Sequence, residues 1–180
     1  MADTLTKLTY QTLQQGKSYL SFAHKTASIQ ARKALKPNDL PGIPVPPQLI
    51  TKLQQRVNDL QATDWQDAED GIYPTSLLFD EPWVDYLRQY PSLVADMPSI
   101  WARADGKKYQ DFDRSIETEG YPSYYVQNFH HQTGGYLSDL SANLYDLQVE
   151  ILFGGSADAM RRRILAPLKA GLKAFNDVPV

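Results

Sequence analysis

Twelve consecutive residues, Lys36 to Pro47, include five prolines, and this segment limits the fold more than any other part of the sequence. Proline lacks a backbone N–H and disrupts helix interiors, so the segment predicts an extended, semi-rigid connector. The residues before it have a moderately amphipathic helical pattern. We therefore predict a helical arm at residues 1–35, the connector at 36–47, a helical body at 48–176 and the start of a linker at 177–180.

The composition favours helices along the whole chain. Leucine and alanine together outnumber valine and isoleucine more than two to one, and β-branched residues are the ones enriched in strands. The 12 prolines and 10 glycines divide the chain into short segments. The predicted fold class is mainly α, an irregular multi-helix domain with an N-terminal helical arm and a proline-rich connector.

Charge and cysteine content exclude several classes of protein. A net charge of −3 with 22% charged residues rules out a strongly basic nucleic-acid binder and a disordered acidic chain. The chain has no cysteine, which excludes disulfides, thiolate metal sites and cysteine nucleophiles. No apolar run reaches the roughly 18 residues of a spanning helix, and the N-terminus has no signal-peptide pattern. We expect a soluble, cytoplasmic protein without a membrane span.

Helix boundaries follow from prolines, glycines and capping residues. An apolar stripe after Pro47 predicts a helix that ends before Gly71. Recurring prolines predict two short helices, Pro82–Tyr90 and Pro98–Asp105. Ser138 is a good cap for a helix that ends at residues 153–155, and Ser156 caps the next one. Pro167 is expected to kink or break the last helix.

The charges are unevenly placed. Bases exceed acids in residues 1–60, and acids exceed bases in residues 61–120. Either these are two solvated faces, or the basic first helix docks on an acidic surface. Three consecutive arginines, Arg161 to Arg163, span most of a helical turn, so at least one of them must face the body and find a carboxylate partner, either within the protein or on a ligand.

Aromatic residues are densest between Tyr121 and Tyr136. Rings with polar tips, interspersed with Asn128, His130 and His131, suit a mostly apolar pocket with a few directed hydrogen bonds. The alternative is that these rings merely seal the core. The two histidines are adjacent, so on a helix they point about 100° apart and cannot clamp one metal as an i, i+4 pair does. We predict no metal site.

Several stretches of the sequence resemble a known family. The specific ones are YPSYYVQNFHHQTGGYLS at residues 121–138, SANLYDLQVEILFGG at 141–155 and ADAMRR at 157–162; DWQDAE at 64–69, SLLFD at 76–80 and PW at 82–83 add to them. Together they resemble the region ahead of the catalytic domain in a group of cyanobacterial class I S-adenosylmethionine-dependent methyltransferases. The element Ala142, Tyr145 and Asp146 is also similar to the helix that precedes the cofactor fold in quinone-type methyltransferases.

This resemblance implies a function and a set of site residues. The chain is then the N-terminal helical lid of a methyltransferase, with S-adenosylmethionine bound mainly by a downstream domain that this chain lacks, and it is not catalytic alone. A small-molecule methyl acceptor, flat or apolar, lies against the lid. The residues expected to bind substrate or cofactor are Tyr125, Asn128, Tyr136, Tyr145 and Arg161.

His130 is the candidate catalytic base, for an acceptor that needs deprotonation. Arg161 is the expected partner of the methionine carboxylate. Two alternatives remain open. The first is a stand-alone helical protein-interaction module. The second, which rests on the histidine pair and the aromatics, is a pigment- or metal-binding helical protein.

Overall fold

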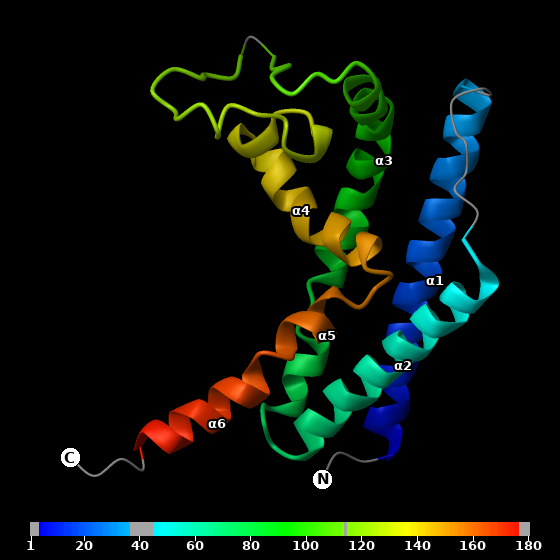
Figure 1. The fold of residues 1–180 in the computed structure, drawn as a ribbon, viewed down its shortest axis with the longest axis vertical. Coiled ribbons are helices and arrows are strands. Elements are labelled where there is room, and N and C mark those ends of the chain that lie inside the picture. The colour runs from blue at the N-terminus through cyan, green and yellow to red at the C-terminus, as the bar shows by residue number, and fades with distance from the viewer. Residues whose placement is uncertain (1–3, 37–44, 114, 177–180) are drawn as a thin grey trace. The chain divides into compact units, whose positions relative to one another are not determined.

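The computed structural model of the chain describes residues 4–36, 45–113 and 115–176, and it is helical, as the sequence predicts. No strand occurs among these residues. Most of the predicted connector at 36–47 and all of the predicted linker at 177–180 lie outside the described residues. Helices and 3-10 turns follow one another along the chain (Figure 1): α1 Thr4–Leu35, α2 Pro47–Glu69, η1 Thr75–Phe79, α3 Trp83–Asp105, η2 Phe129–His131, η3 Gly135–Leu137, α4 Asp139–Leu152, α5 Ala157–Arg162 and α6 Leu165–Asn176.

The chain forms two compact units. Unit 1 consists of Met1–Glu81 and Glu150–Val180, and unit 2 of Pro82–Val149. The boundaries of these units differ from those of the predicted arm at 1–35 and body at 48–176. The division into arm and body stays a prediction.

The core of unit 1 lies where the first half of α1 meets the end of α2. The ring of Tyr10 lies 5.7 Å from that of Trp65, and both side chains are buried. Tyr73 and Leu78, from the segment after α2, complete this core. Apolar burial of this kind stabilises a fold by about 25 cal/mol per Å² removed from water.

The buried face of α1 is mainly polar. Its buried residues are Tyr10, Gln14, Lys17 and Ser21, which follow one another at helical spacing. The large apolar residues of the same helix, such as Leu8 and Phe22, are exposed instead. This helix is therefore held through hydrogen bonds and ion pairs as well as through apolar contact.

The predicted ends of α2 are confirmed. Pro47 occupies the first turn, where its missing N–H costs nothing, and Gly71 follows the helix with a φ of 67°. The apolar stripe of α2 is buried less than its pattern suggests, because Ile50 and Leu53 are 57% and 62% exposed. The first half of this helix thus presents an uncovered apolar face.

In unit 2 the prediction of two short helices, Pro82–Tyr90 and Pro98–Asp105, is wrong. A single helix, α3, continues through both Pro91 and Pro98. Each proline frees the carbonyl four residues earlier, at Leu87 and Val94, and these residues lie on the exposed side where water can satisfy them. The buried side, with Tyr86 and Leu93 one heptad apart, keeps the helix continuous.

The predicted start and end of α4 are confirmed. The backbone N–H of Ser141 donates to Ser138 Oγ over 3.4 Å, which caps the helix. Gly154 and Gly155 end it with φ values of 67° and 80°. A Cβ at Gly155 would lie 2.8 Å from the backbone carbon of Lys17, so only glycine allows α1 to approach this turn. Ser156 does precede α5, but its side chain makes no capping bond, because its Oγ donates to the carbonyl oxygen of Phe153 over 2.7 Å. Pro167 lies in the first turn of α6.

Candidate functional site

A contiguous group of rings lies on the surface of unit 2. We call it the aromatic cluster, and its members are Tyr121, Tyr124, Tyr125, Phe129, His130 and Tyr136. The ring centroid of Tyr125 lies 5.3 Å from that of Tyr136, and Phe129 stacks on Tyr136 at 4.7 Å. Tyr125 and Tyr136 remain 41% and 49% exposed. The cluster therefore offers ring faces and hydroxyl groups to a ligand or to another surface.

Unusual backbone conformations bring these rings together. His130 and His131 have φ values of 53° and 61°, in the left-handed region that costs non-glycine residues roughly 1–2 kcal/mol each. Gly134 and Gly135 follow with φ values of 85° and 49°. A Cβ at Gly135 would lie 2.0 Å from the carbonyl oxygen of Gln127. The chain thus folds back tightly here, which places Tyr136 on Phe129.

Asn128 holds this loop from beneath. Its side chain is buried, and its Oδ1 accepts a hydrogen bond from the backbone N–H of Asp111 over 2.6 Å. Its Nδ2 donates to the carbonyl oxygens of Asp111 and Gln132, each over 3.1 Å. Both ends of the amide are engaged by backbone groups, so in this structure Asn128 positions the loop that carries the cluster.

Arg103 of α3 anchors the loop at a second point. Its Nε donates to the carbonyl oxygen of His131 over 2.7 Å, and its guanidinium also bonds Thr133. The Asp96 carboxylate, also on α3, accepts a hydrogen bond from the Thr133 hydroxyl. His131 itself is half-buried with its ring 5.4 Å from that of Tyr109, whereas His130 is exposed.

Three of the predicted site residues, Tyr125, Tyr136 and His130, therefore belong to one cluster. Tyr145 lies on α4, 42% exposed, and no ring contact recorded for the described residues joins it to the others. Arg161 belongs to unit 1, where its Nη1 donates to Asp158 Oδ1 over 2.7 Å.

The prediction that an arginine of the triplet faces inward is confirmed at Arg162. Its Nε and Nη2 donate to the two carboxylate oxygens of Asp64 over 2.9 and 2.8 Å, a bidentate pair. The hydroxyls of Tyr10 and Tyr73 donate to the same carboxylate, each over 2.7 Å. Arg163 pairs with Asp67. All three arginines thus have internal carboxylate partners.

The pKa values of this network follow from its bonds. Burial alone would raise the pKa of Asp64, but the hydrogen bonds from Arg162, Tyr73 and Tyr10 outweigh it and hold the pKa below the ordinary value. Burial first, and then the Asp64 charge, raise the pKa of Tyr10 above its usual range. The network therefore consists of a fixed ion pair and two neutral phenols. Such an arrangement serves to hold the fold together.

A second buried group of charges in unit 1 was not foreseen from the sequence. Lys17 Nζ lies 2.6 Å from Glu81 Oε1 and 3.5 Å from Glu150 Oε2, and all three side chains are at most 2% exposed. Carboxylate oxygens of Glu81, Glu150 and Asp158 lie within 4.8 Å of one another. Because the ammonium of Lys17 lies against Glu81 and Glu150, it supplies a positive charge that a metal ion would otherwise bring.

Glu81 of this group has a pKa close to neutral pH. Burial raises its pKa from 4.5 to about 7, Lys17 opposes the rise, and the charges of Glu150 and Asp158 add to it. A cavity of about 200 Å³ adjoins Glu81, Asp158 and Arg161. A carboxyl group with this pKa beside a small cavity can exchange a proton near pH 7.

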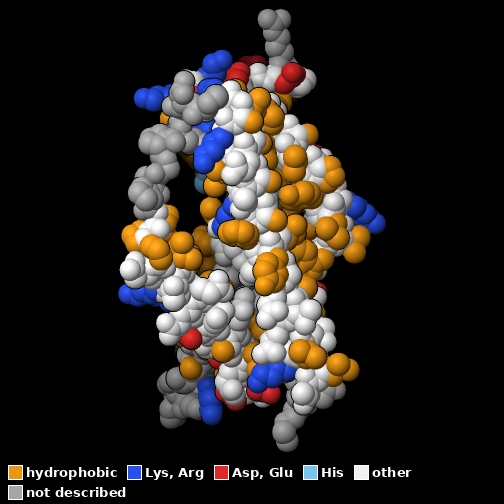
Figure 2. All heavy atoms as spheres, turned by 90° about the vertical axis from the view of Figure 1, so that its right-hand side faces the viewer, with side chains coloured by type: hydrophobic (Ala, Val, Ile, Leu, Met, Phe, Trp, Pro, Cys, Tyr) orange, Lys and Arg blue, Asp and Glu red, His pale blue; other side chains and the backbone are white. Residues whose placement is uncertain are grey.

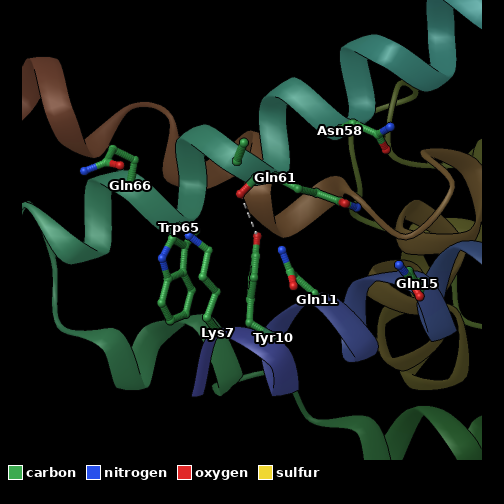
Figure 3. A pocket seen from close by; sticks show the side chains of 9 residues that line it. Lys7, Tyr10, Gln11, Gln15, Asn58, Gln61, Trp65 and Gln66 are labelled. Carbon is green, nitrogen blue, oxygen red and sulfur yellow. Dashed lines mark hydrogen bonds between the residues drawn. The ribbon is translucent and has the colours of Figure 1, made fainter. Parts of the chain in front are cut away.

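An amide-lined pocket of about 480 Å³ lies between α1 and α2. Figure 3 shows Lys7 beside the indole of Trp65, with Gln11 and Gln15 on the α1 side facing Asn58 and Gln61 of α2. Lys7 Nζ lies 5.7 Å from the centre of the Trp65 ring. Neutral amides can bind both hydrogen-bond donors and hydrogen-bond acceptors. None of the site residues predicted from the sequence lines this pocket.

The described residues contain only part of what a site for S-adenosylmethionine requires. An aromatic wall is present at Tyr125 and Tyr136, and it is open to a ligand. The acid that normally holds the ribose lies at the carboxyl end of a parallel strand, and no strand occurs among the described residues. Arg161, the expected carboxylate partner, is already paired with Asp158.

No family model matches the chain, and no curated protein and no solved structure matches it. None of the helices in the described part of the chain has the length and apolar character needed to cross a membrane.

Proposed function

We propose that this chain is the helical, substrate-side part of an S-adenosylmethionine-dependent methyltransferase and is not catalytic by itself. The observation that carries the proposal is the exposed aromatic cluster of unit 2, which lies in the stretch that resembles the cyanobacterial enzymes. The proposal places the enzyme in the cytoplasm and gives it a small-molecule methyl acceptor, with no nucleic acid as partner.

The cluster supports a flat or apolar acceptor. Stacked and edge-on rings with centroids about 4.5–7 Å apart form a surface on which another ring can stack, and Tyr125, Phe129 and Tyr136 have this spacing. Methyl transfer is an in-line displacement that depends on positioning and on the exclusion of water. A lid of rings, closed over the acceptor, contributes to both.

His130 is the group in this cluster that can take up a proton. It is exposed, and its ring centroid lies 4.0 Å from that of Phe129. It serves as a base only for an acceptor whose nucleophile must be deprotonated. The cofactor itself is held mainly by the downstream domain, with Tyr145 and Arg161 as further contacts.

Calorimetry on two proteins tests this division. The 180-residue chain should bind S-adenosylmethionine very weakly or not at all, and the product of the longer reading frame should bind it and turn over. In the longer protein, Tyr125→Ala should lower kcat/KM about tenfold, the effect of losing about one stacking contact. Tyr19→Ala, at an exposed tyrosine of α1, is the matched control. Micromolar binding by the short chain, or an unchanged Tyr125→Ala enzyme, would refute the proposal.

A stand-alone protein-interaction module is the second candidate. The uncovered apolar face of α2, with Ile50 and Leu53 more than half exposed, favours it. The reading frame after Val180 distinguishes the two. A continuing frame with a glycine-rich turn supports the methyltransferase, and a stop codon followed by an unrelated gene supports the module.

A further inference from the structure

An apolar groove of about 510 Å³ lies within unit 1 and shares no residue with the aromatic cluster. Its walls come from α1 and the first half of α2, and its floor from the turn after α4 and the start of α5. Its apolar lining includes Phe22 of α1, Ile50, Leu53 and Leu60 of α2, and Leu152 at the end of α4. This volume lies in the range of small-molecule sites.

The apolar walls are open to solvent. Phe22, Leu53 and Leu152 are each more than 60% exposed, and Figure 2 shows hydrophobic side chains open to the viewer on the face that α1 and α2 present. Between Ile50 and Leu60 the wall extends over ten residues of α2, about 15 Å at the helical rise per residue. An alkyl chain of about that length removes this surface from water.

The charges that line the groove are all positive. Lys25 and Arg56 are among its lining residues, and no aspartate or glutamate is, although the chain as a whole has a net charge of −3. Lys25 lies against the floor, because its Nζ donates to the carbonyl oxygen of Leu152 over 3.0 Å. Burial lowers the pKa of Lys25, and a neighbouring anion would favour its charged form.

We propose that this groove binds a free long-chain fatty acid, with the alkyl chain along the apolar wall of α2 and the carboxylate at Lys25. The groove has apolar walls without acidic residues, and it has a cation on each of α1 and α2. These features match a ligand that has one long apolar part and one negative end. A neutral lipid of the same length lacks the charge, and a partner helix would need acidic residues to match the same groove.

Displacement of a fluorescent probe measures this binding. The delipidated 180-residue chain is loaded with 11-dansylaminoundecanoic acid and titrated with palmitate or with hexadecanol. Palmitate should displace the probe saturably at one site per chain. Hexadecanol should bind about tenfold more weakly, since it cannot form the charge-assisted hydrogen bond.

Matched variants locate the site. Leu53→Asp places a charge in the apolar wall and should abolish binding, whereas Leu8→Asp, at an equally exposed leucine of α1 outside the groove, should leave it unchanged. Lys25→Gln should weaken palmitate about tenfold and hexadecanol little. Circular dichroism checks that each variant folds.

Three results would overturn the proposal. They are equal affinity for hexadecanol and palmitate, unchanged binding in Leu53→Asp, and a change of self-association in Leu53→Asp with no palmitate binding by the parent chain. The last result would assign the groove to a second copy of the chain. None of these outcomes depends on S-adenosylmethionine, so the methyltransferase proposal stands or fails separately.

Discussion

Replacing Arg162 by methionine should remove a large part of the stability of unit 1. The substitution leaves the Asp64 carboxylate buried, with the two tyrosine hydroxyls as its remaining donors. It also removes the donor to the carbonyl oxygen of Leu77. Breaking one side of a buried ion pair costs about 3–5 kcal/mol. Because Tyr10 and Tyr73 still hold the carboxylate, we expect the lower end, about 3 kcal/mol, against a typical total of roughly 5–15 kcal/mol.

Arg161→Met is the matched control on the same helix. Its partner Asp158 is also a carboxylate, but the Arg161 side chain is 45% exposed and the pair is three residues apart in sequence. Exposed pairs of this kind contribute roughly 0–1 kcal/mol. Both variants therefore lose an arginine that is paired with a carboxylate, and the two pairs differ in burial.

Urea unfolding, followed by tryptophan fluorescence, measures the free energy of unfolding of both variants. Trp65 is one of the tryptophans that contribute to this signal. The buried Trp65 ring lies next to Tyr10, so it reports on the same core. The pH dependence gives a second reading. Since the folded pKa of Asp64 is low, its contribution is present above its unfolded pKa, about 4, and is lost as the pH falls through the folded value. Arg162→Met lacks the donor that lowers the folded pKa most, so this pKa should rise and the loss of stability on acidification should be smaller than in the parent chain. A loss below about 1 kcal/mol, or equal losses in both variants, would refute the reasoning.

The remaining predictions concern a buried acid, a buried amide and a glycine. Burial raises the pKa of Glu81 from 4.5 to about 7, so between these pH values the folded state holds a proton that the unfolded state has lost. The free energy of unfolding should therefore fall as the pH rises through this range. Glu81→Gln should remove this pH dependence of the urea midpoint. Neither polar atom of the Gln14 side chain has a hydrogen-bond partner among the described residues, so Gln14→Met should stabilise the protein by about 1 kcal/mol in the same assay. Gly135→Ala should cost at least about 2 kcal/mol and loosen the loop in hydrogen exchange, whereas Gly120→Ala, with no neighbouring atom within 4 Å, should cost about 1 kcal/mol; equal costs would contradict the contact described at Gly135.

Local signals in the sequence predict the helix ends well. Pro47, Gly71 and Ser138 act on their own neighbours, so their effect does not depend on the rest of the fold. The same rule failed at Pro91 and Pro98, because a proline on the exposed side of a helix frees a carbonyl that water satisfies. The sequence does not show which side a proline will occupy.

The site could be predicted only in part. The aromatic run between Tyr121 and Tyr136 is local, and the structure gathers most of it into one cluster. The arginine triplet required an inward partner, but that partner, Asp64, lies 98 residues earlier in the chain. The buried group around Lys17 combines residues from three distant segments, and each of them looks like an ordinary surface charge in the sequence.

Nuclear magnetic resonance on the isotope-labelled 180-residue chain tests the central claim, that unit 2 offers an aromatic surface for the acceptor but does not hold the cofactor. One sample is titrated with menadione, a flat naphthoquinone, and a second with S-adenosylmethionine at the same concentrations. We predict shifts for menadione that centre on the ring signals of Tyr125, Phe129 and Tyr136, and no saturable shifts for S-adenosylmethionine. Saturable micromolar binding of S-adenosylmethionine, or menadione titrations that leave these three rings unshifted, would contradict the account.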